Sequence, residues 1–169
     1  MKYSKEREMY PDVAEWLQNY LSQRHKRRVV RTQVCATQRL NKVLHALGVQ
    51  PLLPQEYQSW DVQVDVVGLV LSSTHAELVL VECKNKPITL GHLSQMIGYC
   101  RVVKPIFGLV LSPVGVSPAL RNLIQVFGRS DILVYDSPKN RAARRVALAQ
   151  WDSRSKSLVP SSVIPTGEF

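Results

Sequence analysis

Three ionisable residues lie on two neighbouring strand-like segments of the chain. Asp65 falls within residues 62–71, and Glu82 and Lys84 end the stretch 77–84. Both segments are rich in β-branched and other apolar residues, in a partly alternating pattern that is typical of strands. Two carboxylates beside one ammonium can hold a divalent cation and orient a water molecule toward a phosphodiester. These residue types therefore favour a nuclease.

A short polar turn should pair the two segments as an antiparallel hairpin. Residues 72–76 read Ser-Ser-Thr-His-Ala, which is polar enough to turn and short enough to join adjacent strands. With the turn centred in this stretch, Asp65 lies opposite Glu82, and their Cβ atoms are about 5 Å apart. Because side chains alternate across a strand, Lys84 shares the face of Glu82, and the Cys83 side chain faces the other way.

Two alternatives apply to this group of charges. The same register places Asp61 opposite Lys86, roughly 13 Å further along the strand, so Asp61 is a weaker candidate ligand than Asp65. The charges could also be the solvated face of a half-exposed hairpin. However, their neighbours on both strands are Val and Leu, which is typical of strands covered on both faces. We therefore favour the functional interpretation.

The order of these residues resembles a known family of nucleases. Sixteen residues separate Asp65 from the Glu-Cys-Lys run at 82–84. This order is similar to the PD-(D/E)xK nuclease superfamily, which includes restriction endonucleases, Holliday-junction resolvases and RecB-type exonucleases. Gln95 and Tyr99 match the Gln-x-x-x-Tyr pattern that some branches carry on the following helix, and their spacing puts both on one helix face. Val64 stands where the nominal pattern has proline.

The resemblance implies a fold and a chemistry. The expected fold is α/β, a restriction-endonuclease-like mixed β-sheet flanked by helices on both faces. The expected activity is Mg²⁺-dependent (or Mn²⁺-dependent) hydrolysis of DNA phosphodiester bonds. Asp65, Glu82 and the main-chain carbonyl of Cys83 would bind the metal. Lys84 would hold the attacking water or neutralise the phosphate, and the nearby carboxylates should keep it protonated.

Further site residues are expected on two helices. Gln95 and Tyr99 would position the scissile strand. Family members often supply another acid from an N-terminal helix, here predicted over residues 5–21. That helix offers the acids Glu6, Glu8, Asp12 and Glu15. Of these, Glu8 and Glu15 lie on nearly the same side of the helix, and the sequence does not choose between them.

The net charge of +9 comes from 22 basic and 13 acidic residues, and the basic ones are clustered. Such clusters attract polyanions by releasing condensed counterions, although a basic solubilising surface is an alternative. Taken together with Asp65, Glu82 and Lys84, these basic clusters favour DNA as the partner. The residues expected to contact nucleic acid, besides Tyr99, are Lys86, Arg24, Lys26, Arg27, Arg28, Arg31, Arg141, Arg144 and Arg145.

The remaining pattern predicts one α/β domain over residues 1–150 and a C-terminal tail over 151–169 that is loosely ordered apart from Trp151. Alternating strands and helices after the hairpin predict parallel pairing. Besides residues 5–21, helices are expected at 37–47, 89–103 and 119–127, strands at 28–34, 106–111 and 132–135, and a helix or arm at 136–150.

The cysteine content and the absence of long apolar runs indicate the environment. The three cysteines, an odd number without paired spacing, favour an intracellular, cytoplasmic protein. No stretch is long enough to span a membrane. The protein would act as a homodimer or as a subunit of a larger nucleic-acid-processing complex. A non-catalytic nucleic-acid-binding module with a nuclease-like fold is the alternative function.

Overall fold

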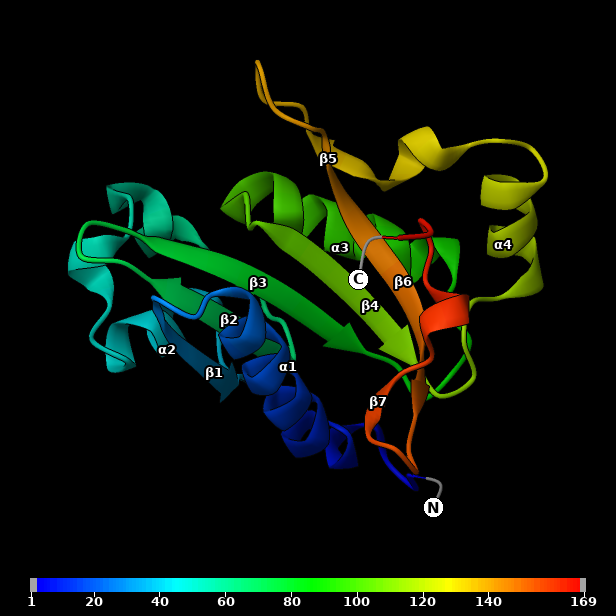
Figure 1. Ribbon diagram of the computed structural model, residues 1–169, viewed down its shortest axis with the longest axis horizontal. Coiled ribbons are helices and arrows are strands. Elements are labelled where there is room, and N and C mark those ends of the chain that lie inside the picture. The colour runs from blue at the N-terminus through cyan, green and yellow to red at the C-terminus, as the bar shows by residue number, and fades with distance from the viewer. Residues whose placement is uncertain (1–2, 168–169) are drawn as a thin grey trace.

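The computed structural model describes residues 3–167, which form a mixed sheet with helices on both faces (Figure 1). The α/β class and the mixed sheet predicted from the sequence are confirmed. The strands are β1 (Val29–Val34), β2 (Val66–Leu71), β3 (Ala76–Cys83), β4 (Phe107–Ser112), β5 (Val134–Asp136), β6 (Arg144–Asp152) and β7 (Ser157–Leu158). The α-helices are α1 (Tyr10–Arg24), α2 (Leu40–Ala46), α3 (Leu90–Val103) and α4 (Pro118–Gln125).

The strand order is β1-β2-β3-β4-β6-β5, with β7 added to β6. The first three strands are antiparallel neighbours, whereas β3, β4 and β6 run parallel. The carboxyl ends of these parallel strands therefore meet at one edge of the sheet, which we call the carboxyl edge. The opposite edge, which carries the β2–β3 turn and the start of β6, is called the amino edge.

The predicted hairpin and its register are confirmed. Val66 pairs with Val81, and the pairing continues without a bulge to the turn. Continued by one residue, this register sets Asp65 opposite Glu82. The register is fixed because a slip of one residue would turn every apolar side chain of the strands to the other face.

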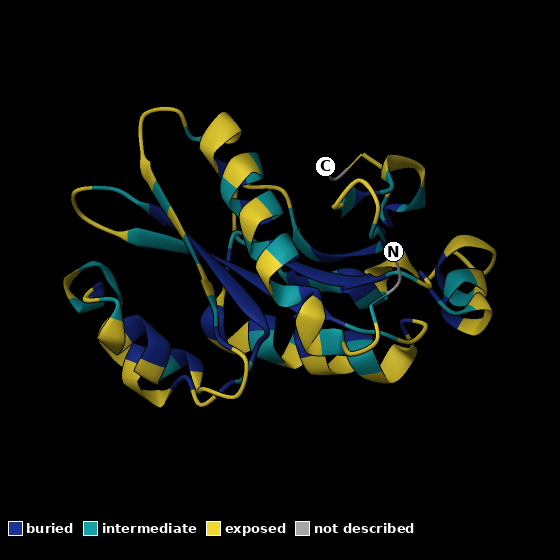
Figure 2. Cartoon of the chain, turned by 90° about the horizontal axis from the view of Figure 1, so that it is seen from below, coloured by how far each residue is buried: buried dark blue, intermediate teal, exposed yellow. Residues whose placement is uncertain are grey.

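Helices cover both faces of the sheet. On one face, Val13, Leu17 and Leu21 of α1 pack in a buried cluster with Val81 and Trp151. On the other face, apolar side chains of α2, α3 and α4 form the second cluster with strand residues such as Leu80. Figure 2 shows the strands as a buried layer between helices whose outer surfaces are exposed. Both faces of the central strands are thus withdrawn from water.

The N-terminal helix is shorter and later than predicted. A 3₁₀ turn at Glu6–Glu8 precedes α1, and Pro11 lies in the first turn of α1. Pro11 therefore opens this helix, since proline is tolerated where the backbone N–H has no helical partner. Gly68 lets α1 approach the sheet closely, because a Cβ atom there would lie 2.8 Å from Leu21 Cδ1.

The prediction of a helix or arm at residues 136–150 is wrong for its second half. This segment contains β6, which pairs in parallel with β4 and in antiparallel fashion with β5. The expected parallel pairing is confirmed for β3 and β4 but is wrong for β5. In β6 the small residues Ala147 and Ala149 are fully buried in the cluster that also contains Leu158 and Val163, so this strand is specified by long-range packing.

The prediction that the chain after Trp151 is loosely ordered is also wrong within residues 152–167. Trp151 belongs to β6 and is 1% exposed. The chain then turns back, β7 pairs with β6, and Ile164 forms a β-bridge with Leu148. Two apolar residues of this returning segment, Leu158 and Val163, are buried. Their burial stabilises the segment despite its Ser- and Pro-rich composition.

None of the helices within residues 3–167 combines the length and the apolarity that a membrane crossing requires.

Candidate functional site

The three residues singled out from the sequence lie at the carboxyl edge, on the sheet face covered by α3. Asp65 directly precedes β2, Glu82 lies near the end of β3, and Lys84 follows that strand. The backbone of Asp65 is held on both sides, since its N–H donates to Val81 O (3.2 Å) and its carbonyl accepts from Cys35 N–H (2.8 Å). Both carboxylates are therefore placed by ordered backbone.

Hydrogen bonds connect the side chains of this site. The Lys84 ammonium donates to Glu82 Oε1 at 2.7 Å, and the Cys83 N–H donates to Asp65 Oδ2 at 2.8 Å. The Tyr10 hydroxyl, from the first turn of α1, is near enough to Asp65 to lower the pKa of its carboxyl. Glu82 Oε2 is buried and has no hydrogen-bond partner within residues 3–167. This oxygen is the available acceptor of the site.

Burial controls the ionisation of both acids. Asp65 is 8% exposed and Glu82 is 6% exposed. Burial, reinforced by the charge of Asp65, raises the pKa of Glu82 to about 7, although the Lys84 ammonium opposes the shift. Burial also raises the pKa of Asp65. For Lys84, burial lowers the pKa, but the bond to Glu82 and the surrounding acids outweigh it, so the net shift is upward.

The two N-terminal acids proposed from the sequence are not at this site. Glu8 is exposed and accepts hydrogen bonds from the Ser4 N–H (2.8 Å) and the Ser4 hydroxyl (2.7 Å). Glu15 is exposed on α1. Within residues 3–167 neither acid hydrogen-bonds or ion-pairs with Asp65, Glu82 or Lys84, so the structure does not support either as a contributor.

Glu6 takes the place expected for Glu8 or Glu15. Its Oε2 accepts a hydrogen bond of 3.1 Å from the Asn85 N–H, and its Oε1 lies 3.8 Å from Lys84 Nζ. The Tyr10 hydroxyl reaches the same Glu6 oxygen at 3.4 Å. The spacing of Glu6 and Tyr10, four residues apart, is the sequence signal that could have pointed to this pair.

One face of α3 leads away from the site. The Gln95 Nε2 donates to the Tyr99 hydroxyl at 2.9 Å, so the predicted common face is confirmed. His92 lies one turn earlier on α3. Burial lowers the pKa of His92, and the nearby charge of Lys84 lowers it further. Within the described residues, neither Gln95 nor Tyr99 hydrogen-bonds to Asp65 or to the other residues of the site.

Lys86 and Asp61 do not form the second charge pair considered from the sequence. Lys86 is exposed beyond β3, and its carbonyl accepts from the Ser112 hydroxyl at 2.7 Å. Asp61 is 75% exposed at its side chain and pairs with Arg39 at 3.2 Å. The hairpin register does not extend to Asp61 because β2 begins only at Val66.

The two basic clusters lie at the amino edge, away from the acidic site. Arg28 forms an ion pair with Glu77, which is five residues before Glu82 and thus about 16 Å from it along β3. The neighbouring members of this cluster are Arg24, which stacks on Tyr20, and Lys26, Arg27 and Arg31.

The second basic cluster surrounds the start of β6. Arg144 donates to the carbonyl of Lys104 at 3.0 Å and lies 3.8 Å from Asp136, whereas Arg141 and Arg145 flank it in sequence. The basic clusters therefore do not surround the acidic site. The sequence could not reveal this, since the two ends of a strand look alike until the pairing of its neighbours is known.

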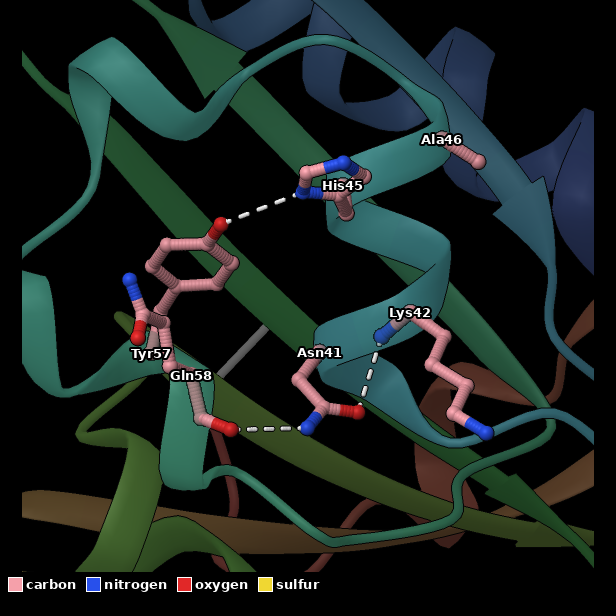
Figure 3. A pocket seen from close by; sticks show the side chains of 6 residues that line it. All are labelled: Asn41, Lys42, His45, Ala46, Tyr57 and Gln58. Carbon is pink, nitrogen blue, oxygen red and sulfur yellow. Dashed lines mark hydrogen bonds between the residues drawn. The ribbon is translucent and has the colours of Figure 1, made fainter.

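A separate small pocket of about 310 Å³ lies between α2 and the 3₁₀ helix Gln55–Ser59 (Figure 3). Its polar groups largely bond to one another: Asn41 Nδ2 donates to Gln58 O at 2.8 Å, and His45 Nδ1 lies 3.4 Å from the Tyr57 hydroxyl. No acidic side chain lines it. We therefore do not assign the chemistry to this pocket.

The donor atoms of the acidic site suit a hard divalent cation. No group of three or more His, Cys, Asp and Glu side chains spaced as in a metal site occurs in residues 3–167. Mg²⁺ often binds through only one or two carboxylates and retains several waters. Asp65 and Glu82 provide such a pair, with the unpartnered Glu82 Oε2 at hand. A cation between them would offset the repulsion that raises the pKa of Glu82.

Comparison of the chain with protein-family models gives no match, and comparisons with curated proteins and with solved structures give no significant match.

Proposed function

We propose that this protein is a Mg²⁺-dependent (or Mn²⁺-dependent) nuclease with a restriction-endonuclease-like fold, which hydrolyses DNA phosphodiester bonds. The observation that carries the proposal is the pairing of Asp65 with Glu82 at the end of two central strands, beside the ammonium of Lys84. Buried charges are costly unless they are paired or bind a ligand, so two neighbouring buried acids require an explanation.

The residues divide the work according to their contacts. Asp65 and Glu82 would hold the metal, with the carbonyl of Cys83 as a further oxygen ligand. When bound, a Mg²⁺ ion lowers the pKa of a coordinated water and neutralises charge on the phosphate. Lys84 stays protonated beside Glu82 and offers its ammonium to the phosphate or the attacking water. Glu6 fixes this ammonium from the other side.

Cys83 does not act as a nucleophile in this proposal. Its side chain lies in the buried cluster beneath α1, on the face opposite Glu82. Burial raises the pKa of its thiol well above the ordinary value, so the reactive thiolate is disfavoured.

Two further observations support a nucleic-acid substrate. The order of Asp65 and the Glu-Cys-Lys run resembles the PD-(D/E)xK nuclease superfamily, as does the Gln95 and Tyr99 pair on α3. The net charge of +9 favours a polyanionic partner. Gln95 and Tyr99 would position the scissile strand from the face of α3 that begins at His92.

The test is hydrolysis of plasmid, linear duplex, flap, junction and single-stranded DNA, each with Mg²⁺ or with EDTA. The wild type should cleave at least one substrate only with the metal, and Asp65→Asn, Glu82→Gln and Lys84→Ala should not. Asp61→Asn is the matched control, since it removes an exposed acid outside the site. Metal-independent binding with no hydrolysis of any substrate would overturn the nuclease proposal and indicate the non-catalytic binding module.

A further inference from the structure

We propose that the edge strand β1 and a basic hollow at its start form a track for one nucleic-acid strand, leading from the amino edge to Asp65. The inference rests on the proposed function and extends it to the substrate. In this proposal the first basic cluster binds a part of the DNA strand that is distant from the bond cleaved at the carboxyl edge.

The exposed residues of β1 form a continuous row. Val29, Arg31 and Gln33 are exposed, whereas the residues between them are half-buried and turn toward α1. For example, the Thr32 hydroxyl donates to the carbonyl of Ala14 in α1 at 3.0 Å. Because alternate residues share a face, the exposed row lies along the sheet face opposite α1.

This row runs toward the carboxyl edge, where the acidic site lies. Gln33 pairs with Val67, and two residues later the Cys35 N–H donates to Asp65 O at 2.8 Å. Directly paired residues on adjacent strands share a face, so the row and the Asp65 side chain are on the same side of the sheet. From Val29 to Gln33 the exposed row is about 13 Å long, and Cys35 beyond it is buried.

The other end of the track opens into a hollow of about 640 Å³. Arg27 and Arg31 line it and are exposed, and neither has an ion-pair partner within residues 3–167. Arg28, by contrast, is held by Glu77. The hollow is lined by Arg27, Arg28, Val29, Arg31, Leu52, Leu71, Ser72 and Ser73.

The chemistry of the hollow matches a nucleotide chain. Free guanidinium groups and serine hydroxyls are donors suited to phosphate oxygens. Val29 is 59% exposed and, with Leu52 and Leu71, offers apolar surface on which bases can rest. A strand of another protein could instead pair with the edge strand β1. In that case the arginine variants would not change the salt dependence of DNA binding.

Binding without a metal tests the track independently of catalysis. A fluorescein-labelled 12-nucleotide single-stranded DNA is titrated with the full-length protein in EDTA, from 50 to 200 mM salt, with anisotropy as the readout. Arg27→Ala/Arg31→Ala should make the slope of log affinity against log salt shallower by about 1.4, since each lost phosphate contact removes about 0.7. The control is Arg121→Ala/Arg154→Ala, which also removes two positive charges, one in α4 and one after β6. It should leave the slope unchanged.

A second variant tests the path between the hollow and the acidic site. Gln33→Glu places a negative charge at the carboxyl-edge end of the row and should weaken binding of the 12-mer, whereas Gln125→Glu on α4 should not. Three results would each overturn the track. The first is a wild-type slope for Arg27→Ala/Arg31→Ala, and the second is an equal effect of the two double variants. The third is unaltered binding of the 12-mer by Gln33→Glu. If the track is overturned but metal-dependent hydrolysis is observed, the proposed function still stands. If the binding results agree with the track but no hydrolysis is observed, the surface binds DNA and the nuclease proposal fails.

Discussion

The Asp65 carboxylate accepts a 2.8 Å hydrogen bond from the main-chain N–H of Cys83, the residue that directly follows Glu82. The bond ties the acid at the start of β2 to the strand that carries the other acid. It adds to the bond from the Asp65 N–H to Val81 O, so the two carboxylates are fixed relative to one another by backbone. A site that must hold an ion needs such preorganisation.

Glu6→Gln should lower metal-dependent hydrolysis by about 10- to 100-fold, which is the usual effect of losing a residue that supports metal-site ligands. The reason is that Glu6 contacts both Lys84 and the Asn85 N–H. Rates measured at saturating Mg²⁺ check this. Glu8→Gln and Glu15→Gln are the controls, and an equal loss of activity in either would contradict the assignment of Glu6.

Lys84→Ala should destabilise the fold as well as abolish hydrolysis. Removing the ammonium leaves Glu82 buried beside Asp65 without its partner, and breaking a buried pair costs about 3 kcal/mol. Urea denaturation at pH 8 should show this loss in the free energy of unfolding. At pH 5 the loss should be smaller, since Glu82 is then protonated. A loss that does not change with pH would contradict the ion pair.

Glu82 should give the fold a distinctive pH dependence. Its pKa is about 7 in the fold, against an ordinary value of 4.5, so the folded state holds a proton that the unfolded state releases between these values. The free energy of unfolding should therefore fall as pH rises from about 4.5 to about 7. Urea denaturation of the wild type and Glu82→Gln checks this, and Glu82→Gln should lose that part of the dependence. Identical pH profiles would show that Glu82 titrates normally.

Tyr10→Phe should weaken metal binding without unfolding the protein. The Tyr10 hydroxyl helps to keep Asp65 ionised, and removing it raises the pKa of Asp65. An interaction between a hydroxyl and a charged group contributes about 1.5 kcal/mol, so Mn²⁺ affinity near neutral pH should fall by about tenfold. Calorimetric titration measures this, with Tyr99→Phe as the matched control. Unaltered affinity in Tyr10→Phe would remove Tyr10 from the site.

The local parts of the fold were predictable from the sequence. The hairpin register followed from the polar turn and from the apolar residues on both strands, and the observed pairing of Val66 with Val81 agrees with it. The predicted helix at 119–127 agrees with α4, which begins at Pro118 and is capped by the Ser117 side chain accepting from the Leu120 N–H. In each case residues close in sequence determine the structure.

The missed features depend on contacts between distant residues. Nothing near Glu6 indicates that it meets Asn85, which is 79 residues away. The stretch of β6 is mixed basic and alanine-rich, and it becomes a strand only because β4 offers a parallel partner on the covered sheet. The opposed positions of the basic clusters and the acidic site likewise follow from strand order, which no local pattern contains.

Mn²⁺ binding measured by calorimetry at pH 8 tests the central claim most directly, because it examines the paired carboxylates without requiring the correct substrate. The account predicts binding to the wild type and to Asp61→Asn, and its loss in both Asp65→Asn and Glu82→Gln, with DNA hydrolysis lost in the same two variants. Equal Mn²⁺ binding by all four proteins, or none by the folded wild type at millimolar Mn²⁺, would contradict it.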